Sequence, residues 1–240
     1  RVHKDYEKDP ESSPFRVYFY ARAVIKFPQR AKNTQKATCM NISEIKVRDY
    51  RKNLYPIEDF IIKRWSARAM SGAALPQEEL LRLFEAARWA PSSGNFQERY
   101  FLYAHRNTEQ FDHFFSLLDI WNQEWCGRAS VLLVVLSNRI SPKGKEISTH
   151  AFDTGLAFEN LALQGVAMGL VVHPMGGFDH ERARVELNIP EAYSIHCMAA
   201  VGYPGEISDL SEYNQNREYP NQRKDLSTTF QEGGFPPVSE

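Results

Sequence analysis

The chain has 240 residues, of which 42% are hydrophobic and 12% aromatic, and its charged residues nearly cancel to a net charge of -1. This length and apolar content suffice for one folded domain with its own core. The neutral balance argues against a dedicated nucleic-acid binder, although it leaves room for a local basic patch. No apolar run approaches the roughly 20 residues of a membrane-spanning helix, so we expect a soluble protein without a membrane partner.

Cysteine and histidine spacing predicts no metal site. Cys39, Cys126 and Cys197 are far apart and lack the paired spacing of a zinc site. The seven histidines form no metal-binding motif either, and we interpret each as a surface residue or a hydrogen-bonded core residue. The odd number of cysteines, together with the absence of a signal peptide, favours free thiols in a reducing cytoplasm.

The two ends of the chain differ in composition from its middle. Residues 1–39 are rich in Lys and Arg, and no acidic residue occurs from position 12 to 42. We interpret 1–39 as a flexible or non-native extension, with an organellar transit peptide or a nucleic-acid-binding arm as the alternatives. We expect a folded domain over 40–226 and a polar tail over 227–240, which is either disordered or docked on another surface such as a partner subunit.

Periodicity in the middle of the chain predicts helices with interspersed strands. Pro56 and Pro76 suit the first turns of helices, and Pro91 disfavours a helical residue before it. The first of these helices places Ile57, Phe60 and Ile61 on one face. The predicted helices span 56–65, 76–90, 109–118, 150–168 and 180–187, and the predicted strands span 100–104, 131–136, 170–173 and 195–201. This order favours an α+β or α/β sandwich with helices around a mixed sheet.

Two short segments concentrate polar side chains. Residues 64–68 read Arg-Trp-Ser-Ala-Arg and place two guanidinium groups around a serine, which suits a phosphate monoester. Residues 90–97 read Ala-Pro-Ser-Ser-Gly-Asn-Phe-Gln and follow a predicted helix. Separately, the arginines could form ordinary surface ion pairs, and the loop could be a turn with its own hydrogen bonds. Together they suggest a phosphorylated organic cofactor, whereas dinucleotide, Walker and serine-hydrolase motifs are missing.

These segments give the chain a resemblance to a known family. Two further segments follow them along the chain. They are Pro174-Met175-Gly176-Gly177-Phe178-Asp179 and Gly202-Tyr203-Pro204 leading to Arg223. From about residue 56 to 226 the sequence resembles the FMN-dependent nitroreductase family. The resemblance implies an α+β helix/mixed-sheet/helix sandwich and an intertwined homodimer, with an FMN at each of two sites built from both chains.

The resemblance also implies which residues bind FMN. The phosphate and ribityl contacts are assigned to Arg64, Trp65, Ser66, Arg68 and Arg223. The loop from the other subunit supplies Pro91, Ser92, Ser93 and Asn95. The segment at the flavin N5 edge is Met175, Gly176 and Gly177, with Asn122 near the ring. Trp65 and Gly176 depart from the residues that are more usual in the family at these positions, and no catalytic side chain is expected because FMN carries the chemistry.

The activity implied by the resemblance is that of an FMN-dependent NAD(P)H oxidoreductase. Such an enzyme reduces nitroaromatic, quinone or related small electrophilic substrates by ping-pong hydride transfer. Three other activities fit the same fold, namely those of a dehalogenase, an enone reductase and a dehydrogenase. A protein that binds or stores flavin without turnover is the alternative outside enzymes.

Overall fold

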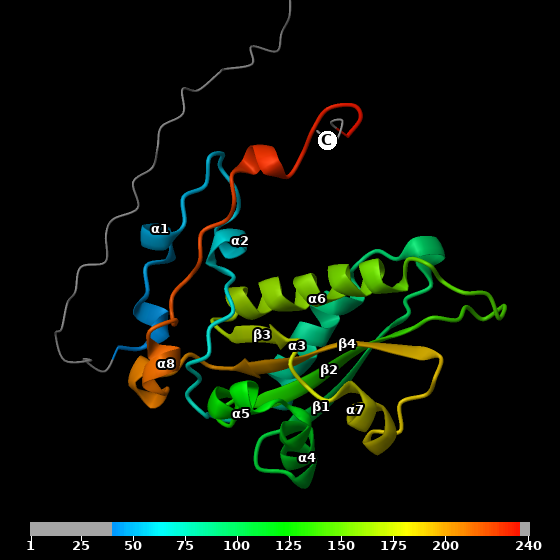
Figure 1. Cartoon of the computed structure of the whole chain (residues 1–240), viewed down its shortest axis with the longest axis horizontal. Coiled ribbons are helices and arrows are strands. Elements are labelled where there is room, and N and C mark those ends of the chain that lie inside the picture. Colours follow the sequence, from blue (N-terminus) through cyan, green and yellow to red (C-terminus); the bar gives the residue numbers. More distant parts are fainter. Residues whose placement is uncertain (1–39, 236–240) are drawn as a thin grey trace, which may run out of the picture. The chain divides into compact units, whose positions relative to one another are not determined.

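A four-stranded sheet between two layers of helices forms the centre of the computed structural model, which describes residues 40–235 (Figure 1). The strands are β1 (Arg99–His105), β2 (Val131–Asn138), β3 (Val171–Met175) and β4 (Tyr193–Gly202), in the spatial order β1-β2-β4-β3. The predicted extension at 1–39 and the last five residues of the predicted tail lie outside the described residues.

The expected mixed sheet is wrong for these strands, because all three neighbouring pairs are antiparallel. The helix α6 (His150–Ala167) connects β2 to β3, and these two strands run in the same direction. However, β4 lies between them and runs the opposite way, so β2 and β3 never pair. Insertion of a later strand depends on tertiary contacts and leaves no local signal in the sequence.

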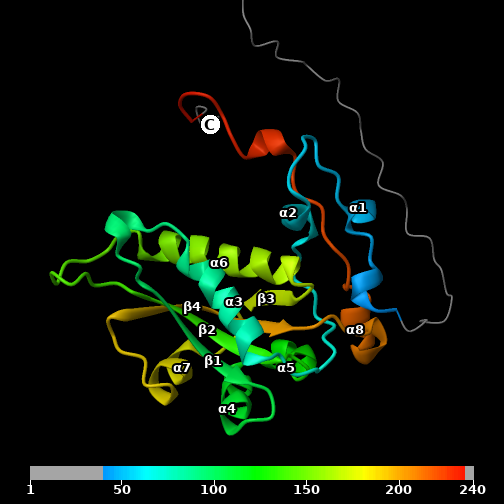
Figure 2. The same cartoon turned by 180° about the vertical axis from the view of Figure 1, so that it is seen from behind.

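The helices α3 (Gln77–Arg88) and α6 cover one face of the sheet and pack on each other (Figure 2). Leu80, Leu83 and Ala87 of α3 recur every three or four residues and are fully buried, as the sequence predicts. Close packing extends to α6, where a Cβ on Gly165 would lie 2.7 Å from Cγ2 of Val172. A small residue is therefore required where α6 crosses β3.

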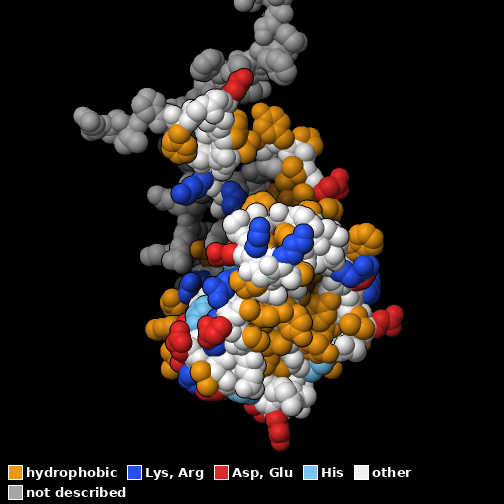
Figure 3. Space-filling view, turned by 90° about the vertical axis from the view of Figure 1, so that its right-hand side faces the viewer, with side chains coloured by type: hydrophobic (Ala, Val, Ile, Leu, Met, Phe, Trp, Pro, Cys, Tyr) orange, Lys and Arg blue, Asp and Glu red, His pale blue; other side chains and the backbone are white. Residues whose placement is uncertain are grey.

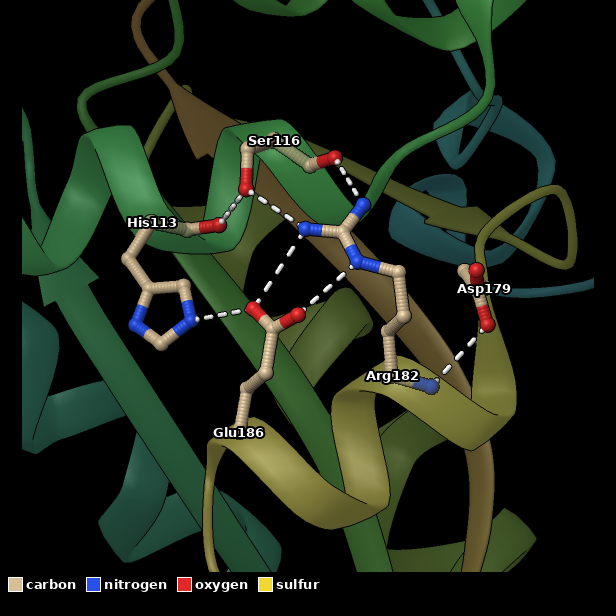
Figure 4. Close-up of polar contacts among 5 residues, drawn as sticks. All are labelled: His113, Ser116, Asp179, Arg182 and Glu186. Atoms are coloured by element: carbon tan, nitrogen blue, oxygen red, sulfur yellow. Dashed lines mark hydrogen bonds and ion pairs between the residues drawn. The ribbon is translucent and has the colours of Figure 1, made fainter.

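The opposite face is covered by α4 (Glu109–Leu117), α5 (Ile120–Cys126) and α7 (His180–Glu186). Figure 4 shows how α7 is joined to α4. Arg182 donates to Oε1 of Glu186 at 2.8 Å and to the Ser116 carbonyl at 3.1 Å, and Nε2 of His113 lies 2.8 Å from Oε2 of Glu186. Asp179 caps α7 by accepting from the Arg182 backbone amide at 3.0 Å. These contacts fix the segment that leads from β3 into α7.

The remaining helices are short. They are α1 (Val47–Tyr50), α2 (Asp59–Lys63), α8 (Glu212–Gln215) and the 3-10 turns Ile42–Glu44, Ser93–Asn95, Ile207–Asp209 and Leu226–Thr228. The predicted helix over 56–65 is therefore reduced to α2, and its side chains Ile57, Phe60 and Ile61 are exposed whereas Ile62 is buried. The helix ends at Lys63 because Arg64 has an extended backbone. Among the residues described, no helix is both long and apolar enough to cross a bilayer.

Candidate functional site

A cavity of about 250 Å³ opens beside the segment that follows α2. Its lining is dominated by guanidinium groups, from Arg51, Arg64, Arg68, Arg217 and Arg223. The other lining residues are Trp65, Ser66, His173, Tyr219 and Asn221. The structure thus brings together the predicted residues of segment 64–68 and the predicted Arg223 from the far end of the described chain.

Positive charge in this cavity exceeds the negative charge beside it. Arg68 Nη1 lies 3.5 Å from Oε2 of the buried Glu218, and Arg64 Nε lies 3.7 Å from Oε1 of Glu159. Within the described part of the chain, no acidic side chain forms an ion pair with the other three arginines. Guanidinium groups match the oxygens of phosphate, so the donor set fits a phosphate group.

The pKa of Arg51 is lowered in this cavity. Burial, followed by the charges of Arg223 and Arg64, lowers the pKa of Arg51 to about 10. The side chain remains a cation at neutral pH, but its charge lies in an unfavourable environment. An anion in the cavity would relieve that repulsion.

His173 also lines the cavity and is an uncharged group among the arginines. Its ring on β3 contacts that of Trp125 with centroids 4.4 Å apart and planes tilted by 30°, and its Nδ1 lies 2.8 Å from the carbonyl oxygen of Ala67. Because a carbonyl only accepts, Nδ1 carries the proton and Nε2 is left as an acceptor. Burial lowers the pKa of His173 to about 4, and the charges of Arg68 and Arg64 act in the same direction. At neutral pH the imidazole can accept a hydrogen bond from a hydroxyl group.

The end of β3 continues into the predicted glycine segment. The carbonyl oxygen of Gly177 accepts from the Asp119 backbone amide at 3.1 Å and from Nδ2 of Asn122 at 2.9 Å. A Cβ on Gly177 would overlap the Asp119 carboxylate and would lie 2.8 Å from Nδ2 of Asn122. Gly176 is exposed, and a Cβ there would meet no atom within 4 Å, whereas Met175 is buried. Asn122 and the glycine pair are therefore neighbours, and open space lies over Gly176.

The predicted loop at Pro91, Ser92, Ser93 and Asn95 does not line the arginine cavity of its own chain. The Ser93 amide donates to Oδ2 of the buried Asp153 on α6 at 2.9 Å, and Ser92 Oγ accepts from the Gln97 amide at 3.0 Å. Asn95 has a φ of 56°, in the left-handed region that asparagine tolerates. The loop is held by its own hydrogen bonds and by α6, and most of it remains exposed.

Sequence reasoning missed several cavity residues, namely Arg51, His173, Arg217, Tyr219 and Asn221. None of them belongs to a motif of the predicted site. Arg51 follows a one-turn helix, and the last three lie in a polar stretch after β4. The only available signal is the recurrence of basic residues in that polar stretch, where the family resemblance points to Arg223 alone.

Comparisons with known proteins agree with this geometry. The family model described as "Nitroreductase family" matches residues 61–114 and 106–203. A solved structure described as an oxidoreductase containing FMN is 38% identical, with a TM-score of 0.75, and the similarity covers 78% of this chain and 97% of that one. A nitroreductase family protein from Clostridium difficile 630 has the same fold at 20% identity, with a TM-score of 0.57 and coverage of 73% and 97%.

A curated relative is an uncharacterized 15.4 kDa protein from Mycolicibacterium smegmatis, 32% identical over 93 residues. That match covers 38% of this chain and spans 60% of the relative's length. The family model covers more than half of the chain, and the 38% identical structure is matched over nearly its whole length. The chain therefore belongs to the nitroreductase family.

Proposed function

We propose that this protein is an FMN-dependent oxidoreductase that reduces nitroaromatic, quinone or related small electrophilic substrates, with NADH or NADPH as hydride donor. The observation that carries the proposal is the cavity in which Arg64, Arg68 and Arg223 converge with too few carboxylates to balance them. Family membership and the 38% identity to an oxidoreductase containing FMN support the same cofactor.

The residues of the site fit the phosphate, the ribityl chain and the ring of FMN in turn. The arginines and Ser66 would hold the phosphate, and Nε2 of His173 is available as an acceptor for a ribityl hydroxyl group. The open space above Gly176 leaves the backbone accessible to a flat ring, and Asp119 and Asn122 hold Gly177 in place. When bound, FMN supplies the hydride chemistry, and the protein orients it and supplies the charged setting.

The proposal includes a homodimer in which the loop at Pro91, Ser92, Ser93 and Asn95 reaches the cofactor of the partner subunit. The absence of this loop from its own chain's arginine cavity supports the idea. Large hydrophobic side chains close to the loop in the sequence, Trp89, Phe96 and Tyr100, are exposed, and so is Phe152 beside Asp153, which holds Ser93. Figure 3 shows hydrophobic side chains gathered on one face of the molecule. Light scattering tests the proposal, and a monomer that carries flavin would contradict it.

An absorption spectrum followed by anaerobic titration with NADH and with NADPH tests cofactor and reaction together. We expect a yellow protein that is bleached by at least one nicotinamide and reoxidised by a nitroaromatic compound or a quinone. Turnover with halophenols or enones instead would indicate one of the related reductive activities. A yellow protein that neither nicotinamide bleaches would indicate flavin storage, and a colourless protein that takes up no FMN would refute the proposal.

Paired variants test the phosphate contacts. Replacing Arg64 and Arg223 together by Ala should weaken FMN binding by several kcal/mol, since each charged hydrogen bond contributes about 1.5–3 kcal/mol. Arg48→Ala is the matched control, because Arg48 is exposed, pairs with Asp59 and does not line the cavity. Flavin content after gel filtration gives the readout, and unchanged content in the double variant would reject the assignment.

A further inference from the structure

The polypeptide over residues 217–223, here termed the strap, completes the arginine cavity from beyond the segment that the family model matches, which ends at residue 203. The strap contributes Arg217 and Arg223. It is not part of the sheet or of either helical layer. The cavity therefore depends on how the strap is held against the rest of the domain.

Three consecutive residues at the end of α1 contact the strap in order. The contacts are the rings of Tyr50 and Tyr219 with centroids 6.1 Å apart, Arg51 Nε donating to the Asn221 carbonyl at 2.9 Å, and Gln222 Nε2 donating to the Lys52 carbonyl at 3.2 Å. Segments that are distant in the sequence thus lie side by side along one short stretch, as the blue and orange ribbons of Figure 1 show.

Arg51 is the central residue of this contact. Its side chain is buried, with 7% of the residue exposed. Besides the bond to Asn221, its Nη1 donates to the Ile62 carbonyl at 2.8 Å and to the Arg64 carbonyl at 2.7 Å. One guanidinium group thereby fixes both the backbone that carries Arg64 and the strap that carries Arg223.

Glu218 anchors the other end of the strap. Its side chain is fully buried, and its Oε1 accepts from the backbone amides of Arg68 at 2.6 Å and Ala69 at 2.8 Å. The docked strap is consequently held at both ends, and Arg223 is brought close enough to Arg51 to disfavour its charge. Docking has an electrostatic cost that a bound anion can offset.

We propose that Arg51 is a positioning residue that docks the strap against the backbone of Arg64, and that a phosphate group in the cavity stabilises the docked strap. Identification of that phosphate with the cofactor rests on the proposed function. Phosphate binding and strap docking are then linked, because each brings together groups that the other requires.

Flavin binding to the full-length protein tests the role of Arg51. Arg51→Gln should weaken FMN binding about tenfold to a hundredfold, the factor expected from losing one charged hydrogen bond, and should leave riboflavin binding unchanged because riboflavin lacks the phosphate. Arg51→Lys keeps the charge, but its donors all lie on one nitrogen and cannot replace both Nε and Nη1, so it should resemble Arg51→Gln. Arg48 is an exposed arginine on α1, just before Arg51, and Arg48→Gln should bind both flavins as the wild type does.

Trypsin cleavage in the strap, with inorganic phosphate as the probe, tests the coupling without any flavin. Phosphate should slow cleavage after Arg217 and Arg223 severalfold relative to chloride at equal ionic strength, and Arg51→Gln should lose that protection. Three results would each overturn the inference, namely equal loss of FMN and riboflavin, normal FMN binding by Arg51→Lys, or no protection of the wild type by phosphate. Failure of the wild type to bind FMN would reject the proposed function, while the trypsin experiment would still decide the inference.

Discussion

Acidification should destabilise the protein through His173. Folding lowers the pKa of this imidazole from 6.5 to about 4, chiefly by burial. The unfolded chain therefore binds the proton more tightly, so the stabilising contribution is complete above pH 6.5 and is lost as the pH falls towards 4. The difference of 2.5 between these two pKa values corresponds to about 3.4 kcal/mol, of which about 2 kcal/mol is lost by pH 5.

Urea unfolding at pH 7, 6 and 5 measures this contribution. His173→Gln cannot take up the proton, so its free energy of unfolding should fall by about 2 kcal/mol less than that of the wild type between pH 7 and pH 5. His105→Gln is the matched control, since His105 lies on β1 with its Nε2 2.8 Å from Gln77 and away from the arginine cavity. Parallel curves for the wild type and His173→Gln would refute the reasoning.

Two further substitutions test the glycine segment and the buried acid beside the Ser93 loop. Gly177→Ala should lower the free energy of unfolding by about 1–3 kcal/mol and reduce flavin content, because the added methyl group overlaps the Asp119 carboxylate. Gly176→Ala is the control and should fold normally, since its methyl group meets no atom within 4 Å. Equal thermal unfolding of the two variants would contradict this prediction. Burial, together with the neighbouring Asp153, raises the pKa of Glu98, so its ionisation disfavours the folded state as the pH rises. Glu98→Gln should therefore gain stability relative to the wild type as the pH rises above 4.5, and a gain independent of pH would contradict the assignment.

The elements that the sequence predicts well are those whose pattern is local. The apolar run of β2 is buried on both faces, and α3 buries its expected residues Leu80, Leu83 and Ala87. The helix expected over 56–65 is wrong in extent, and at its C-terminal end Arg51 donates to the carbonyl oxygens of Ile62 and Arg64. These contacts come from another segment of the chain, and no periodicity within 56–65 reveals them.

The same distinction applies to the site. The residues of segment 64–68 are adjacent in the sequence, so the sequence alone predicts that their hydrogen-bond donors bind a phosphate. The structure places Arg64, Trp65, Ser66 and Arg68 in the cavity lining. The sequence predicts only a surface or core position for His173, since a lone histidine on a strand carries no signal of the arginines that lie near it in the structure. Asn122 contacts Gly177, but its role near the flavin ring remains a prediction, and the role of Ser92, Ser93 and Asn95 remains a prediction about a second chain.

The strap has a consequence for synthesis of the protein. The sheet is complete once β4 has left the ribosome, but Arg217 and Arg223 emerge after it. A nascent chain can thus build its core before the residues that complete the arginine cavity are available, so binding of an anion by the whole cavity must follow formation of the sheet.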